Sequence, residues 1–307
     1  MKRLIKILSI LIFLSTKSSL FAGDFEDYAW WNKTHNYDGV SPWTSYLKTS
    51  AAWFGPNALL PPIMNKALII NQFRLEFRPE FHYSKGDRTL DVFTALHIPL
   101  AKNVDFHIHI VPVEYFEMDS ATRHQRFVRH IDASGVEGGD FWFGTNFQLL
   151  NEEKHGVDIL ASAYFKTASG TGLEYARYTD APGYFLSVSF GKFFGGKLNK
   201  DIRPFRFYGH LGFYAYQTWD FLHNQNDCVL YGAGAQWNHV FFKAHLELNG
   251  YLGYLNNGDR PSILNFRIET NNRTINYHLI LQKGIHDYAY QTIGLGWTIQ
   301  FGKPLSD

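Results

Sequence analysis

Apolar and polar side chains alternate along residues 71–83, whose sequence is NQFRLEFRPEFHY. Successive side chains of a β-strand point to opposite faces, so this segment predicts a strand with one apolar and one charged face. The charged face carries Arg74, Glu76, Arg78, Glu80 and His82. The same alternation recurs along most of the chain that follows, which is typical of a closed barrel with lipid outside and water inside.

Twelve segments after residue 65 show strand character, and an even number suits an antiparallel barrel. They span residues 66–83, 88–99, 103–117, 138–150, 156–168, 183–194, 203–219, 227–238, 241–255, 261–270, 273–283 and 287–301. Most connections on one side are short and polar, whereas the other side includes two longer loops, at 118–137 and 170–182. Outer-membrane barrels have this asymmetry, with their short turns in the periplasm. We therefore predict an all-β fold, a transmembrane antiparallel up-and-down β-barrel of about twelve strands over residues 66–303, followed by a tail at 304–307.

Two features interrupt the regular pattern. Phe185 and Phe193 fall on the face of strand 183–194 opposite to Tyr184 and Leu186. Pro79 lies inside the first strand, where it removes a backbone hydrogen-bond donor and predicts a β-bulge.

The N-terminal residues have the three parts of a secretory signal peptide. A basic start is followed by an apolar run over residues 7–14 and by a polar stretch that ends at Ala22. The apolar run is much shorter than the ~20 residues that a membrane-spanning helix needs. We expect residues 1–22 to be cleaved near Ala22 and the mature chain to reach the outer membrane of a Gram-negative bacterium.

Residues 23–65 do not alternate and form a separate N-terminal segment. Ser41 and Pro42 are suited to be the N-cap and first turn of a short helix. One face of that helix would carry Trp43, Tyr46, Leu47 and Ala51. Two interpretations of the segment stay open: an ordered leader packed against the barrel mouth, or a plug inside the lumen.

Composition agrees with a barrel and narrows the possible partners. Aromatic residues make up 17% of the chain and glycines number 26, which suits long strands with aromatic girdles at the membrane interfaces. A formal net charge of +1 gives no reason to expect a nucleic acid or an acidic partner. The single cysteine, Cys228, cannot form an internal disulfide, so an extensive hydrogen-bonded framework must hold the chain together.

The chain resembles bacterial outer-membrane β-barrel proteins over residues 66–301 and in its signal peptide. The closing sequence, Gly296-Trp297-Thr298-Ile299-Gln300-Phe301, is similar to the terminal-strand signal that such proteins present to the barrel-insertion machinery. It departs from that pattern at Gly294, where a polar residue is common, and in the six residues that follow Phe301. The resemblance implies outer-membrane lipid, lipopolysaccharide and the insertion machinery as partners, and by itself it fixes no function.

The inward-facing charges of the first strand allow two interpretations. They alternate in sign about 7 Å apart, so they can neutralise one another across neighbouring strands. Alternatively, they form a lining that selects solutes. His107 and His109 share a face with Asp105, but two histidines at strand spacing are a weak metal signal, and we predict neither a metal nor a cofactor.

A basic run lies near the loop at 118–137, and it predicts a solvated surface or pore rim, or else a contact with anionic lipopolysaccharide or an anionic solute. The run consists of Arg123, His124, Arg126, Arg129 and His130.

From these patterns we predict a passive channel or transporter for small hydrophilic solutes, with no catalytic residue. The predicted lumen-lining residues are Arg74, Glu76, Arg78, Glu80, His82, His107, His109, Arg206, His210, Lys243 and Glu247. Two alternatives stay open: a structural or surface-interaction barrel with a filled lumen, and a barrel hydrolase acting on envelope lipid or peptide. The sequence contains neither an HExxH nor a GxSxG motif of the kinds that hydrolases use.

Overall fold

The structure, a computed structural model, describes residues 28–196, 203–272 and 274–302. The predicted signal peptide at 1–22 and the predicted tail at 304–307 lie outside the described residues. Within the described part, every helix is too short or too polar to cross a membrane.

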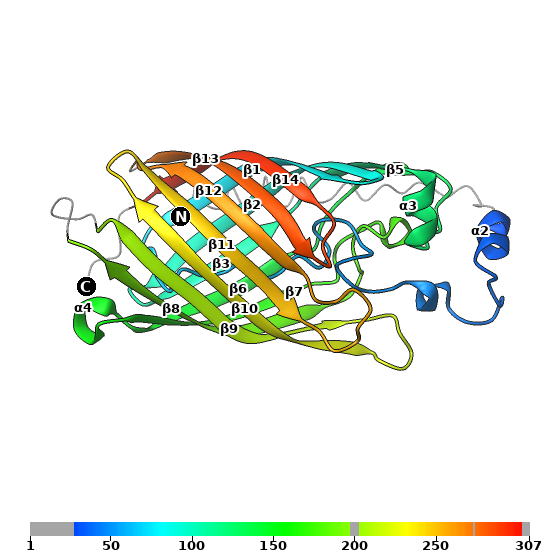
Figure 1. Cartoon of the computed structure of the whole chain (residues 1–307), viewed down its shortest axis with the longest axis horizontal. Helices are drawn as coiled ribbons and strands as arrows, with labels where there is room; N and C mark the ends of the chain where they lie inside the picture. Colours follow the sequence, from blue (N-terminus) through cyan, green and yellow to red (C-terminus); the bar gives the residue numbers. More distant parts are fainter. Residues whose placement is uncertain (1–27, 197–202, 273, 303–307) are drawn as a thin grey trace.

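One antiparallel sheet of fourteen strands dominates the described residues, and all but two of these strands close into a barrel (Figure 1). The barrel strands are β1 (Phe73–Ser84), β2 (Asp87–Ala101), β3 (Val104–Ile110), β6 (Trp142–Leu150), β7 (Asp158–Lys166), β8 (Gly183–Phe194), β9 (Phe205–Gln217), β10 (Gln225–Asn238), β11 (Phe242–Leu252), β12 (Ser262–Thr270), β13 (Ile275–His286) and β14 (Gln291–Phe301). β1 pairs with both β2 and β14, so the wall has no free edge. The other two strands, β4 (Glu114–Met118) and β5 (Ser134–Glu137), form a hairpin that extends the sheet beside β2. The predicted fold class and number of barrel strands are confirmed.

The first and third strands differ from their predicted boundaries. β1 begins at Phe73 and not at residue 66, because the residues before it lie inside the lumen. The predicted strand at 103–117 is divided into β3 and β4. The interruption contains Pro112, which has no backbone N–H to donate to a neighbouring strand.

The predicted bulge at Pro79 is wrong. Pro79 pairs with Val92 of β2 in an unbroken register. The register with β14 is also the same on both sides of Pro79, although the ladder has a gap at Arg78 and Pro79. The missing N–H therefore removes local pairing without inserting a residue.

The helices are all short: α2 (Ala29–Thr34), α3 (Ser120–Gln125), α4 (Glu152–His155) and the 3₁₀ turns η1 (Trp43–Tyr46) and η2 (Leu173–Tyr175). The helix predicted at Ser41 is reduced to the single turn η1. Ser41 does not cap it, because its hydroxyl donates to the Asp38 carboxylate at 2.6 Å.

The outer face of the barrel is apolar, as strand β9 illustrates. Phe207 and Leu211 are 54% and 60% exposed, whereas the alternating Arg206 and His210 are 0% and 1% exposed. Each large apolar side chain left in water would forgo roughly 1.5–3 kcal/mol of burial. Exposed apolar side chains recur on most of the other barrel strands, so this face is suited to lipid and the barrel spans the membrane.

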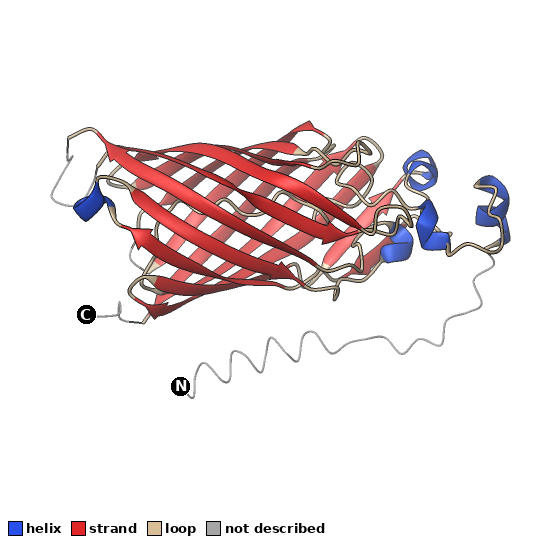
Figure 2. Cartoon of the chain, turned by 90° about the horizontal axis from the view of Figure 1, so that it is seen from below, coloured by secondary structure: helices blue, strands red, loops and turns tan. Residues whose placement is uncertain are grey.

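The two ends of the barrel differ in their connections (Figure 2). The turn end carries the connections β2–β3, β6–β7, β8–β9, β10–β11 and β12–β13, together with α4 and the end of β14. The opposite loop end carries α2, η1, α3 and the β4–β5 hairpin (Figure 1).

The N-terminal segment runs through the barrel from the loop end to the turn end. Its first part, residues 28–46, lies over the loop end and is called the cap here. Residues 47–72, called the plug, then pass through the lumen. At the loop end the Gly55 amide donates to the Ala176 carbonyl (2.8 Å), and nearer the turn end the Ile69 amide donates to the Gln148 side chain (3.0 Å). β1 starts directly after the plug, at the turn end.

Candidate functional site

The lumen contains a cavity of about 1750 Å³ that extends to the turn end. At that end it is lined by Lys102 and Asn103 of the β2–β3 turn and by Glu153 of α4, and at its inner end by Asn57 of the plug. One wall is formed by plug residues 60–66 and 68–72. The cavity is therefore the space left between the plug and the barrel wall.

Most of the predicted lumen residues line this cavity. They are Arg74, Glu76, Arg78, Glu80, His82, His107, His109, Lys243 and Glu247. Arg206 and His210 also point inward but do not line it. The Arg206 guanidinium donates to Asp158 (2.9 Å) and to the Lys66 backbone oxygen of the plug (2.9 Å), and His210 contacts Asn249 at 2.9 Å. Arg206 thus holds the plug, which is a role that strand alternation alone does not reveal.

The charges of β1 are largely paired. The Arg78 guanidinium lies between Glu76 (2.5 Å) and Glu80 (2.8 Å). Arg267 of β12 adds a second guanidinium that contacts both Glu76 (3.2 Å) and Glu269 (3.0 Å). Mutual neutralisation therefore describes most of this ladder.

Arg74 is the member of the ladder that is not fully paired. Its buried Nε has no hydrogen-bond partner among the described residues, and the side chain lines the cavity. A cation in a lumen wall attracts anions and repels cations.

The histidines of β2 and β3 form a stack of rings along the cavity wall. The rings of His97 and His107 are stacked with their centroids 4.0 Å apart, and His109 stacks on Trp142 at 5.7 Å. Sequence reasoning missed His97 because its pairing with His107 depends on the β2–β3 register. Among the described residues, the one group with metal-ligand spacing is Glu80, His82 and Asp91, and it does not include His107 or His109.

The loop-end half of the lumen is filled by an apolar core. Plug residues Phe54 and Leu59 are each 1% exposed and pack among inward-facing aromatic side chains of the wall. Those wall side chains are Trp142, Tyr164, Phe185, Tyr214, Tyr216 and Tyr251. Phe185, which interrupted the expected alternation of β8, faces inward because it belongs to this core and stacks on Tyr164 at 4.7 Å. The lumen is thus filled by packed side chains at the loop end and holds an open, charged cavity toward the turn end.

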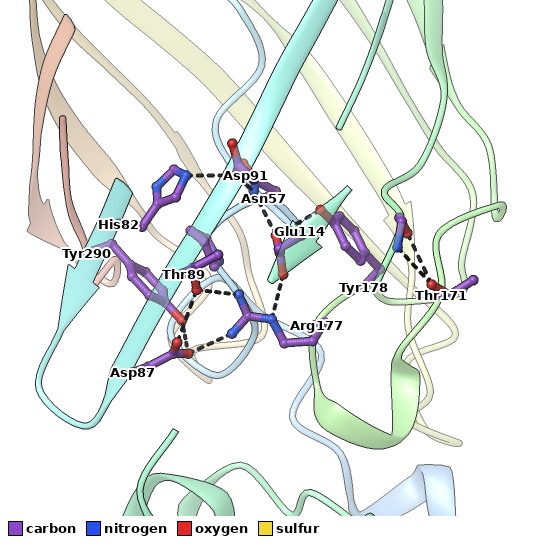
Figure 3. Close-up of polar contacts among 12 residues, drawn as sticks. Asn57, His82, Asp87, Thr89, Asp91, Glu114, Thr171, Arg177, Tyr178 and Tyr290 are labelled. Carbon is purple, nitrogen blue, oxygen red and sulfur yellow. Dashed lines mark hydrogen bonds and ion pairs between the residues drawn. The ribbon is translucent and has the colours of Figure 1, made fainter. Parts of the chain in front are cut away.

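A buried polar network joins the plug, the wall and a loop (Figure 3). At its centre, Arg177 donates to Glu114 (2.6 Å), Asp87 (2.7 Å) and Thr89 (2.7 Å). Asn57 of the plug donates to the same Glu114 at 2.8 Å. These five residues are called the latch here.

The latch is held by charge and by close packing. Burial disfavours the charged form of Arg177, but the Glu114 and Asp87 carboxylates outweigh it and hold the guanidinium pKa well above its ordinary value. The guanidinium lies against the plug backbone at Gly55, where an added Cβ would be 2.8 Å from Cζ of Arg177. A residue without a side chain is therefore needed at this contact.

Cationic side chains also bind the cap. Arg129 lies over the Tyr28 ring at 3.7 Å and Arg123 over the Trp30 ring at 4.6 Å, while Arg126 is buried and pairs with Asp87 at 2.6 Å. The prediction of a solvated basic surface is wrong for Arg126, and the other two arginines are partly covered by the cap.

Comparison with known proteins shows the fold. No protein-family model matches the sequence, and no curated protein matches it. The COG4313 outer membrane channel from Pseudomonas putida F1 matches with a TM-score of 0.50 and 12% identity, over 79% of this chain and 100% of that chain. The NanC porin matches with a TM-score of 0.49 and 8% identity, over 74% of this chain and 100% of that chain. The closed antiparallel sheet and the match to the COG4313 channel show that this chain has the architecture of an outer-membrane β-barrel.

Proposed function

We propose that this protein is an outer-membrane channel for small hydrophilic solutes and that residues 47–72 are its plug. The observation that carries the proposal is the charged cavity of about 1750 Å³ at the turn end, which is stopped at the loop end by the N-terminal segment and its core. A barrel wall that served only as a scaffold would need no ionisable surface of this extent. Solute passage requires the plug to shift.

The contacts of the plug suit a segment that can be displaced. Next to the cavity it is held by separate polar contacts, such as Asn65 to Ser162 (2.9 Å) and Lys66 to His245 (3.0 Å). Each such hydrogen bond contributes only about 0.5–1.5 kcal/mol net, because water replaces it when it breaks. The stronger attachment is at the latch and the apolar core, where opening has to begin.

The location and partners follow from the same proposal. With the turn end in the periplasm, the cavity opens to the periplasm and the cap lies at the cell surface. We expect cleavage of the signal peptide near Ala22 and delivery of the last strand, Gly296 to Phe301, to the barrel-insertion machinery. Outer-membrane lipid and lipopolysaccharide would surround the apolar face.

Reversal of the Arg74 charge tests the lining. We expect Arg74→Glu to shift the permeability ratio toward cations by about tenfold, which corresponds to about 1.4 kcal/mol. Two charges 4 Å apart interact by about 4 kcal/mol at an effective dielectric constant of 20. Reversal of a single charge can therefore supply the free-energy difference that the expected shift requires. The reversal potential measures it, in a planar bilayer under a salt gradient and in a barrel that also lacks residues 28–68, because the full-length barrel is expected to be closed.

Lys192→Glu is the matched control, because Lys192 lies on the exposed outer face of β8. It makes the same charge change without facing the lumen. Equal selectivity shifts in the two variants would contradict a lining role for Arg74.

A filled barrel that serves surface interaction is the second candidate, and the buried fit of Phe54 and Leu59 in the wall core favours it. It differs in one outcome: a full-length barrel of this kind would stay silent at every voltage, because its plug does not move. We propose no covalent chemistry for the lumen. Phospholipid or peptide turnover by the purified barrel would favour the hydrolase alternative.

A further inference from the structure

We propose that Glu80, His82 and Asp91 bind a divalent metal ion at the inner end of the cavity. One potential ligand atom from each residue lies within 4.8 Å of those of the other two. The three residues are 5%, 2% and 5% exposed. Glu80 and His82 line the cavity, so an ion can reach them from the lumen.

Asp91 differs from the neighbouring carboxylates in its partners. Glu80 contacts the Arg78 guanidinium, and both Asp87 and Glu114 contact that of Arg177. Asp91 contacts no guanidinium among the described residues. Its Oδ2 accepts from Asn57 (2.5 Å) and lies 2.8 Å from Nε2 of His82. Its buried Oδ1 has no hydrogen-bond partner. A buried carboxylate oxygen without a partner is unfavourable in a low-dielectric site, and a bound cation would satisfy it.

The donor set points to zinc or a similar divalent transition-metal ion. One imidazole nitrogen and two carboxylate oxygens are common zinc ligands, and three protein ligands leave a fourth position for water from the cavity. Nδ1 of His82 contacts Thr292 Oγ1 at 2.7 Å, and this contact orients the ring with Nε2 toward Asp91. Arg78 competes for Glu80 at 2.8 Å, so His82 and Asp91 are the main ligands and Glu80 is the third.

A proton on His82 is the alternative way to balance Asp91. In that case the His82–Asp91 pair is complete, and the site takes up no metal. The two possibilities are separated by binding alone, so the test does not depend on whether the barrel conducts.

The experiment uses the full-length folded barrel in detergent, stripped with a chelator and then equilibrated with Zn²⁺ at pH 7.5. Metal content after desalting is measured by mass spectrometry, together with titration calorimetry. We expect one tightly held Zn²⁺ per chain, lost in His82→Gln and in Asp91→Asn. His107→Gln is the matched control, because His107 is also a buried histidine that lines the cavity but lies outside the cluster. Folding of each variant is checked by its gel mobility before and after boiling.

A folded wild-type barrel that retains no stoichiometric Zn²⁺ would overturn the proposal, as would equal loss in His107→Gln. If the ligand variants do not fold, Co²⁺ in the wild-type barrel decides the question. The expected result is a visible absorption spectrum of four- or five-coordinate Co²⁺ that Zn²⁺ abolishes, and absence of that spectrum contradicts the site.

Discussion

A chain that lacks residues 28–68 is expected to form open pores where the full-length chain is closed. The deletion removes the cap and most of the plug, including Phe54, Leu59 and the polar contacts of Asn65 and Lys66. The wall keeps all twelve of its strands and both neighbours of β1, because β1 starts only at Phe73. At low voltage in planar bilayers, where the plug is expected to stay in place, we expect a change from no resolved current steps to stable steps of one size.

The deletion also exposes the inner aromatic core of the wall to water, so its folding has to be checked. A folded barrel migrates differently before and after boiling on a denaturing gel, which provides the control. A deletion variant that passes this check and stays silent would contradict a lumen that is closed by the plug alone.

Loss of Arg177 is expected to destabilise the loop end by about 3–5 kcal/mol, because removal of one partner leaves buried charges without compensation. In Arg177→Met, Glu114 loses its guanidinium partner, and Arg126 is the one guanidinium that still contacts Asp87. Both carboxylates are buried. The same change removes the contact between the Arg177 guanidinium and the plug backbone at Gly55. We expect a lower urea concentration at the unfolding midpoint. The intensity of the folded gel band at each urea concentration measures it.

Arg88→Met is the matched control, since Arg88 lies one position after Asp87 on β2 and is exposed. Surface substitutions of this kind usually change stability by less than about 0.5 kcal/mol. Adding Glu114→Gln to Arg177→Met should restore part of the stability, because it removes one of the unpaired charges. Similar losses in Arg88→Met and Arg177→Met would show that the latch is not a special source of stability.

The wall of the barrel was predictable because its pattern is local. In β9, side chains alternate between lipid and lumen with period two, so Phe207 and His210 could be assigned to opposite faces without knowing any neighbour. The number of strands followed from the same alternation and from the turns between them.

The interior was not predictable because its contacts join residues that are far apart in sequence. The latch brings Asn57, Asp87, Glu114 and Arg177 together from four separate segments. Each was an ordinary polar residue in the sequence, with no spacing that links it to the others. Arg206 illustrates the same limit: alternation assigns it to the inner face, but the plug oxygen that covers it comes from Lys66.

The plug also explains why the beginning of β1 was placed too early. Residues 66–72 read KALIINQ, which mixes apolar and polar side chains much as a strand does. In the lumen, one side of the segment faces the cavity and the other contacts Gln148 of the wall. A segment with one side toward the cavity and the other packed against the wall resembles a barrel strand in sequence, although it lies inside the barrel.

Reversible fixing of the plug is the most direct test of a channel that opens when its N-terminal segment moves. Asn65 and Ser162 contact each other at 2.9 Å, so cysteines at both positions can be joined by a short reducible thiol crosslinker. Variants with only one of the two added cysteines are the controls. The natural Cys228 is buried. In a planar bilayer under a voltage that produces openings in the uncrosslinked barrel, we predict that the crosslinked barrel is silent and that reductant restores the current steps. Equal currents before and after reduction would contradict gating by the plug.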